Sequence, residues 1–197
     1  MQLVHVAGAV ENAEAILLRV RKYSETSLIV SWLTLESGII HTMARGARRP
    51  GSPFAGKLDL FFSAEISFSR SRRSDLHNLR EVEVTAHRHG IQRDYRTLAA
   101  ASYFVHLIEL VAERETPIAE LYELLVRAMT YLEEGEPTRR LVARFEKRVA
   151  EYLGIARPDR PPHELVHTMF HGLPASREKL LEQLAQADKS RPEFPGE

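Results

Sequence analysis

Residues 58–69 read LDLFFSAEISFS, and their apolar and polar side chains alternate. Successive side chains of a β-strand point to opposite faces of a sheet, so this alternation predicts a strand with one core face and one wet face. Phe61 interrupts the polar set, and we expect its ring on the wet face. The predicted core face consists of Leu58, Leu60, Phe62, Ala64, Ile66 and Phe68.

The same two-residue period, with β-branched and aromatic residues, recurs on both sides of this segment. It predicts further strands at 16–21, 27–35, 39–45 and 76–84, separated by turn signals such as Glu36-Ser37-Gly38. Five short strands in about 70 residues favour a small closed barrel, because closing a sheet removes its exposed edges.

After Gly90 the apolar period becomes helical. Helices are predicted at 94–113, from Thr116-Pro117 to Glu134, and at 137–153, 163–171 and 176–188, where Thr116 is the expected N-cap of the second. The fold class is therefore α+β: a five-stranded β-barrel followed by an all-α domain. We expect domains at 1–88 and 89–189 and a frayed tail at 190–197.

The chain has 197 residues, no cysteine and a formal net charge of zero. Disulfides, thiolate metal sites and a cysteine nucleophile are excluded. No segment resembles a signal peptide or a membrane span, so we expect a cytoplasmic protein. The neutral total conceals a basic segment, since residues 45–73 carry seven Lys or Arg side chains against Asp59 and Glu65.

This basic segment is a candidate polyanion-binding surface. Aromatic rings interleave with its cations, and small barrels bind single strands by combining cations for phosphates with rings for bases. The alternatives are a solvated charged surface, a loop anchor for Phe54 and burial under the helical half for Phe61. The candidate DNA-binding residues are Arg45, Arg48, Arg49, Phe54, Lys57, Phe61, Arg70, Arg72 and Arg73.

One motif suggests an enzyme instead. His163-Glu164-Leu165-Val166-His167 matches H-E-x-x-H, in which two histidines four residues apart on a helix bind zinc and the glutamate acts as general base. Here the motif directly follows Pro161-Pro162, and no spacing identifies a third ligand. We therefore expect no metal at His163 and His167, no cofactor and no catalytic residue, with a zinc-dependent hydrolase as the alternative.

Several segments of the chain together form a pattern that is typical of one protein family. In the first half they are Glu14–Arg19, Tyr23–Val30, Thr34, Gly38 and Ala44–Arg49, followed by Leu58 and Phe61. In the second half they are Arg144-Phe145-Glu146 with Leu153-Gly154, and then Leu173–Glu178. With these segments the chain resembles the RecO family of recombination mediators, over about residues 14–184 and only thinly after Gly154.

This resemblance implies an N-terminal OB-fold, a C-terminal helical domain and a DNA-binding function without enzymatic activity. Members of the family bind and anneal single-stranded DNA, and they assist RecA loading together with RecR and the single-stranded-DNA-binding protein. Double-stranded DNA is a second candidate ligand, and a nucleoid-associated protein is expected. Many members carry a four-cysteine zinc module where this chain has Arg157–His171, so we expect a shortened, metal-free version. An OB-fold adaptor that contacts mainly protein is a further alternative.

A basic stripe on the helix predicted at 137–153 is a candidate partner site. It lies beside an apolar face, a combination that suits an acidic peptide ending in apolar residues, such as the tail of the single-stranded-DNA-binding protein. The alternative is a solvated stripe paired with glutamates such as Glu151. The stripe consists of Arg140, Arg144, Lys147 and Arg148.

Overall fold

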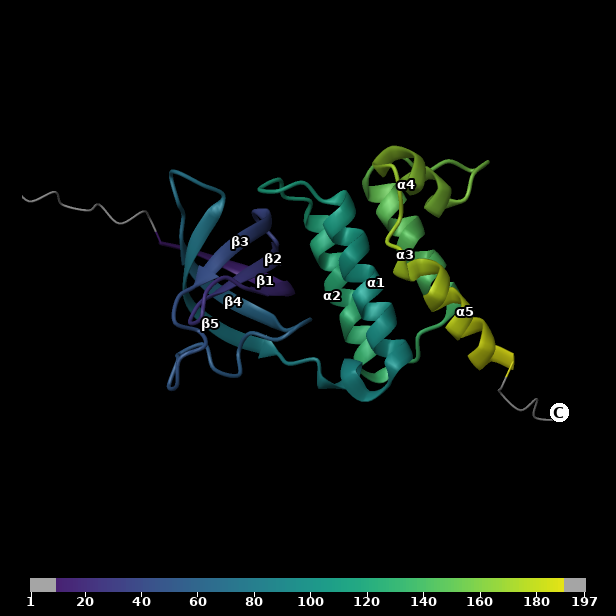
Figure 1. Ribbon diagram of the computed structural model, residues 1–197. Helices are drawn as coiled ribbons and strands as arrows, with labels where there is room; N and C mark the ends of the chain where they lie inside the picture. Colours follow the sequence, from purple (N-terminus) through teal and green to yellow (C-terminus); the bar gives the residue numbers. More distant parts are fainter. Residues whose placement is uncertain (1–9, 190–197) are drawn as a thin grey trace, which may run out of the picture. The chain divides into compact units, whose positions relative to one another are not determined.

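The computed structural model describes residues 10–189, so the segment 190–197 lies outside the described residues (Figure 1). Five strands form a closed barrel in the order β1-β2-β3-β5-β4, a five-stranded barrel of the OB-fold kind. The strands are β1 (Val10–Lys22), β2 (Leu28–Thr34), β3 (Gly38–Ala44), β4 (Ser63–Ser69) and β5 (Leu76–Ala86).

The barrel closes because β1 is long enough to pair with two neighbours. Its first half runs antiparallel to β4 and its second half antiparallel to β2, with a register shift between Leu17 and Arg19. A shift of this kind marks a bulge, which bends a strand. Short parallel pairing between β3 and β5 completes the ring. The sequence predicted only the second half of β1, whose first half carries polar residues such as Glu11 and Asn12.

The barrel interior is filled by side chains at alternate positions of each strand. Val30 and Trp32 of β2, Ile40 of β3 and Ile66 and Phe68 of β4 are among them. The Trp32 indole N–H donates to the Thr42 hydroxyl at 2.8 Å, so the polar atom of the largest core ring is satisfied. These residues confirm the core face that alternation predicted for Ala64, Ile66 and Phe68.

A segment far along the chain completes the barrel unit. The chain divides into two compact units, one with residues up to Arg88 plus Ala112–Val126, the other with His89–Val111 and the residues from Arg127 on. In the first unit Arg114 forms a parallel bridge with Ile39, and the Glu115 N–H donates to the Ile39 carbonyl at 3.1 Å. The predicted division into domains 1–88 and 89–189 stays a prediction.

The second half of the chain is helical, as predicted. A 3-10 turn (His89–Arg93) precedes α1 (Tyr95–Val111), α2 (Ala119–Glu134), α3 (Arg139–Tyr152), α4 (Pro162–Phe170) and α5 (Ser176–Lys189). The predicted N-cap at Thr116 is wrong, because α2 begins at Ala119 and residues 114–116 contact β3 instead. No helix among residues 10–189 is both long and apolar enough to cross a membrane.

A buried ionic contact joins three helices of the second unit. Glu146 of α3 is 2% exposed and accepts hydrogen bonds from the Tyr103 hydroxyl of α1 and from the Arg177 Nε of α5, each at 2.6 Å. A second bond, from Arg177 Nη2, completes a bidentate pair at 3.1 Å. Burial and the neighbouring Glu146 carboxylate raise the pKa of Tyr103 far above its usual value, so its hydroxyl remains a donor.

Candidate nucleic-acid interface

One outer side of the barrel carries two cations, the exposed Arg21 and the half-buried Arg19, beside apolar side chains. Residues that alternate with the core positions of β1, β2 and β3 point outward, and the strand register places them in two cross-strand rows. We call this surface the β1–β2–β3 face. The rows are Arg19, Ser31 and His41, and Arg21, Ile29 and Met43.

The loop after β3 extends this face with three more cations. Arg45, Arg48 and Arg49 are exposed, and backbone hydrogen bonds fix the loop to the β1–β2 turn. The Arg48 N–H donates to the Thr26 carbonyl at 3.0 Å, and the Gly46 N–H donates to the Ser27 hydroxyl at 3.4 Å. The Arg48 guanidinium also donates to the Glu25 carbonyl at 3.1 Å, which leaves other donors of its fork for a ligand.

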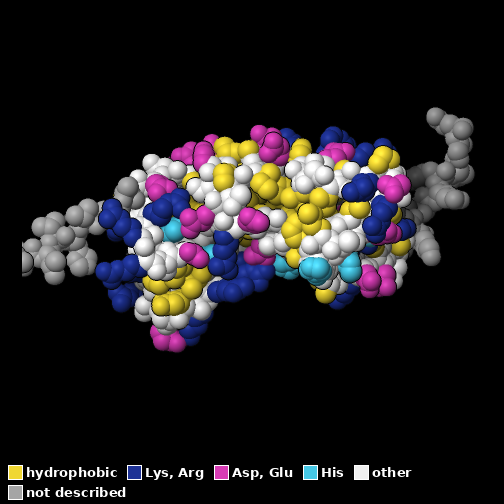
Figure 2. Space-filling view, turned by 90° about the horizontal axis from the view of Figure 1, so that it is seen from above, with side chains coloured by type: hydrophobic (Ala, Val, Ile, Leu, Met, Phe, Trp, Pro, Cys, Tyr) yellow, Lys and Arg dark blue, Asp and Glu magenta, His cyan; other side chains and the backbone are white. Residues whose placement is uncertain are grey.

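Three residues of this surface were missed by the sequence interpretation. Arg19 and Arg21 flank Val20, whose side chain packs against the barrel core, so alternation along β1 assigns both arginines to the outer face. Tyr23 directly follows β1 and is 58% exposed. The two-residue period of β1 could have revealed Arg19 and Arg21, because it assigns both side chains to the outer face. They extend the basic surface to residues before position 45. In Figure 2, Lys and Arg side chains form groups over the barrel unit.

The opposite outer side of the barrel is acidic. Glu65 of β4 lies directly across from Glu14 of β1 and from Glu83 of β5, and all three carboxylates lie on this outer side. Lys57 and Arg80 line a groove of about 580 Å³ on this side, where three carboxylates, those of Glu65, Glu81 and Glu83, outnumber them. Carboxylates repel phosphates, so Lys57 is in a poor position to bind a polyanion and is separated from the β1–β2–β3 face.

Both aromatic rings predicted to stack on bases are buried. Phe54 is 6% exposed and belongs to the barrel core, and Phe61 is 2% exposed. The expectation that Phe61 points into solvent is wrong because β4 begins at Ser63, so residues 59–62 form a turn and do not follow the strand period. Phe61 adopts φ 69° and its N–H donates to the Leu17 carbonyl at 3.0 Å.

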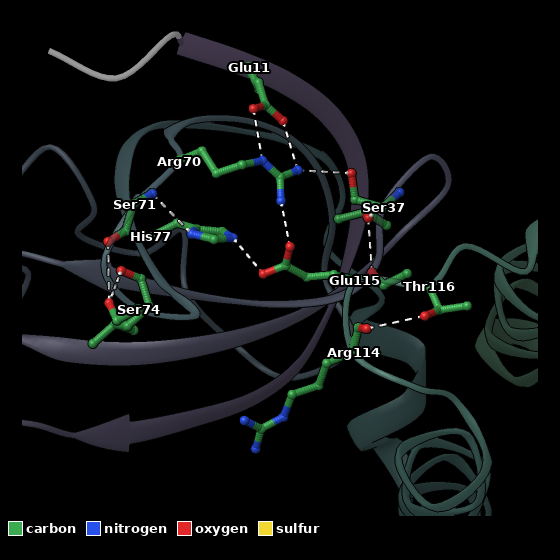
Figure 3. Close-up of polar contacts among 12 residues, drawn as sticks. Glu11, Ser37, Arg70, Ser71, Ser74, His77, Arg114, Glu115 and Thr116 are labelled. Carbon is green, nitrogen blue, oxygen red and sulfur yellow. Dashed lines mark hydrogen bonds and ion pairs between the residues drawn. The ribbon is translucent and has the colours of Figure 1, made fainter. Parts of the chain in front are cut away.

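Arg70 is held in an ionic cluster at the other end of β3 (Figure 3). Its guanidinium forms a bidentate pair with Glu11, at 2.9 Å for both bonds, and donates to Glu115 at 2.8 Å. The bonds to Glu11 raise the pKa of Arg70 and lower that of Glu11. Buried His77 lies 3.4 Å from Glu115, and burial lowers the pKa of its ring. This arginine therefore has a structural role.

The two basic loops predicted from the sequence do not form one surface. Arg45–Arg49 follow the end of β3, whereas Arg70 reaches Ser37, just before β3 begins. A strand of seven residues separates the two ends by on the order of 20 Å. Arg72 and Arg73 are exposed on the Arg70 loop. Their role in DNA binding stays a prediction.

The basic stripe on α3 is partly paired within its own helix. Arg148 and Lys147 approach Glu151 at 2.8 and 3.8 Å, and Arg140 and Arg144 are exposed. Arg140 borders a groove of about 460 Å³. Glu146 and Arg177 also line it, together with apolar side chains from α3, α5, the start of α4 and the residue before α4, namely Val142, Ala143, Leu181, Pro162 and Pro161.

The histidines of the H-E-x-x-H motif lie on α4 and line a groove of about 560 Å³. Arg160 and Arg177 line the same groove together with Glu164 and Glu178, and the Arg160 guanidinium lies 3.8 Å from the Glu164 carboxylate, so the carboxylate of the motif already has a cationic partner. Within residues 10–189, no three His, Asp or Glu side chains gather closely enough to hold a metal ion. The absence of metal at His163 and His167 stays a prediction.

Two family models match the chain and together span most of its described part. The model "Recombination protein O N terminal" matches residues 9–88, and the model "Recombination protein O C terminal" matches residues 92–158. The second match stops before α4, so the groove that holds the two histidines lies outside it.

Curated relatives from several bacteria are named "DNA repair protein RecO". The chain is 32% identical to the protein of Syntrophus aciditrophicus over 75% of its own length, 35% identical to that of Rhodopirellula baltica over 71%, and 34% identical to that of Bacillus subtilis over 63%. These matches cover 57%, 52% and 48% of the three relatives, so the chain spans about half the length of each.

Proposed function

Because the chain belongs to the RecO family, we propose that it is a non-enzymatic, DNA-binding recombination mediator that acts in DNA repair in the cytoplasm, at the nucleoid. In this function it binds and anneals single-stranded DNA, binds duplex through phosphates, and assists RecA loading together with a RecR-like protein and the single-stranded-DNA-binding protein. The observation that supports DNA binding most directly is the distribution of charge around the barrel.

The barrel offers a polyanion one favourable side. Arg19, Arg21 and the cations of the loop at residues 45–49 lie along the β1–β2–β3 face, and Glu14, Glu65 and Glu83 lie across the other side. The strands β2 and β3 and the adjoining loops are the surface with which OB-folds bind oligonucleotides. We assign the phosphate contacts to Arg45, Arg48 and Arg49, with Arg19 and Arg21 continuing the track.

Replacing Arg45, Arg48 and Arg49 together by Ala should weaken DNA binding for every sequence tested. Each phosphate contact to a single strand releases counterions and contributes about 0.7 to the slope of log affinity against log salt, so the slope should fall by about 2. A titration of a labelled oligonucleotide across salt concentrations measures both quantities.

Lys57→Ala is the matched control, because Lys57 is exposed and basic but lies in the acidic groove. Its slope should stay close to that of the wild type. An unchanged slope in the triple variant would place the phosphate contacts elsewhere on the molecule, and Arg72 with Arg73 would be the next pair to replace.

The groove beside Arg140 supports a second contact of the same function, with an acidic peptide such as the tail of the single-stranded-DNA-binding protein. Its apolar lining suits apolar end residues, and Arg140 at its border, with the exposed Arg144 on the same helix, suits the acidic ones. Lys147 and Arg148 contribute less, since Glu151 already neutralises them in part.

Changing Arg140 and Arg144 to Glu should reduce binding of such a peptide at least about tenfold, because a hydrogen bond to a charged group contributes about 1.5–3 kcal/mol. Fluorescence anisotropy of a labelled peptide measures the effect. Changing Lys147 and Arg148 to Glu is the comparison and should cost less affinity. Equal peptide affinity in the wild type and a folded Arg140/Arg144 variant would remove this groove from the proposal.

A further inference from the structure

Tyr23 is an aromatic side chain presented to solvent by the barrel unit. It is 58% exposed. Among the described tyrosine, phenylalanine and tryptophan side chains, two others are exposed to a similar degree, Tyr95 on α1 and Tyr131 on α2, and neither belongs to the barrel unit. The Tyr23 ring is therefore accessible to a ligand that approaches the barrel unit.

The turn that carries Tyr23 is held by its own hydrogen bonds. The Tyr23 N–H donates to the Ser27 carbonyl at 3.0 Å, and the Ser27 N–H donates to the Ser24 hydroxyl at 3.1 Å. An ion pair of 2.6 Å between Lys22 and Glu25 spans the same turn. The ring is therefore attached to a backbone that needs little ordering when a ligand binds.

The surroundings of Tyr23 combine apolar surface with cations on two sides. Ile29 and Met43, both half-buried, form the cross-strand row that Arg21 begins, two residues before Tyr23. On the other side, the Arg48 loop is bonded to the carbonyls of Glu25 and Thr26 in the same turn as Tyr23. Apolar surface between two groups of cations fits a strand whose bases face the protein while its phosphates lie along the edges.

We propose that Tyr23 stacks on an unpaired base and thereby gives the β1–β2–β3 face a preference for single-stranded over duplex DNA. This inference rests on the proposed DNA-binding function and adds the residue that distinguishes the two substrates. Bases in a duplex are already stacked and paired, so Tyr23 gains nothing from them. The arginines contact phosphates, which both substrates have, and cannot supply the distinction.

The test compares Tyr23→Ala and Tyr23→Phe on a labelled oligo(dT) and on a duplex of equal length, using the full chain. Stacking on a base contributes enough that its loss lowers affinity roughly 5- to 100-fold. Tyr23→Ala should therefore lose about that much affinity for the single strand and little for the duplex, with the salt slope unchanged. Tyr23→Phe keeps a ring and should bind like the wild type.

Two controls separate stacking from other effects. Tyr95→Ala removes an equally exposed tyrosine outside the barrel unit and should leave both affinities unchanged. An abasic oligonucleotide keeps the phosphates but lacks bases, so on this probe Tyr23→Ala and the wild type should bind alike. Thermal melting checks that the variants are folded.

The outcomes distinguish this inference from the proposed function. If the wild type binds DNA and the triple arginine variant flattens its salt slope, but Tyr23→Ala keeps its single-strand affinity, the inference is wrong and the proposed function stands. Equal losses on the single strand and the duplex would also overturn it. If the wild type binds neither substrate, both fail together.

Discussion

Glu146→Ala should lower the free energy of unfolding by about 3–5 kcal/mol, because breaking a buried ion pair from one side leaves an uncompensated charge. Glu146 is 2% exposed and is the acceptor of the hydrogen bonds that join the three helices α1, α3 and α5. Its removal leaves the Arg177 guanidinium without its carboxylate and the buried Tyr103 hydroxyl without its acceptor. Chemical denaturation followed by circular dichroism measures the change.

Two variants make this prediction specific. Glu151→Ala removes a carboxylate from the same helix, but one whose pairs with Lys147 and Arg148 lie at the surface, so it should cost at most about 1 kcal/mol. Combining Glu146→Leu with Arg177→Met removes both charges together and should recover much of the stability. A single Glu146→Ala variant as stable as the Glu151 control would contradict a structural role for the buried pair.

Gly38→Ala should destabilise the barrel unit by about 2–5 kcal/mol. Gly38 ends the β2–β3 turn with φ 64°, a left-handed conformation that costs an L-residue about 1–2 kcal/mol. A Cβ atom at this position would also meet the Thr116 backbone, with the carbonyl carbon at 2.7 Å. Overpacking of this kind adds about 1–3 kcal/mol, and the backbone cannot yield as a flexible side chain could.

Gly51→Ala separates the two contributions. Gly51 has φ 72°, nearly the same conformation, but a Cβ atom added there would meet no atom of residues 10–189 within 4 Å beyond its chain neighbours. It should cost only the same conformational share, about 1–2 kcal/mol. The difference in denaturation midpoint between the two variants measures the contact with Thr116. Equal midpoints would mean that the segment around Thr116 moves aside freely.

The barrel strands and most helices could be predicted because their side-chain periods report burial directly. Ala64, Ile66 and Phe68 alternate with polar neighbours, and all three lie in β4. Prediction failed where backbone pairing is decided by distant segments. Thr116-Pro117 resembles a helix start, yet α2 begins at Ala119 and the nearby Arg114 bridges Ile39, a contact that no local pattern encodes.

The candidate site could be predicted only in part, because a local sequence pattern does not show which distant residues a side chain contacts. Charge alone selected Arg45, Arg48 and Arg49 as candidates, and the structure places their loop beside the β1–β2 turn; that they bind DNA stays a prediction. Charge could not reveal that Arg70 is paired to Glu11, 59 residues away in the sequence. Nor could it reveal that Phe54 enters the barrel core, because a ring in a glycine-rich loop is equally compatible with exposure.

The contacts of residues 112–126 with the barrel have a consequence for synthesis on the ribosome. The barrel strands end at Ala86, but their bridge to Arg114 and the bonds that join Glu115 to Ile39 and Arg70 require residues that emerge later. The intervening residues 89–111 belong to the other unit. The two units are thus interleaved along the chain. A nascent barrel therefore remains incomplete until residues 89–111 of the other unit have already left the exit tunnel.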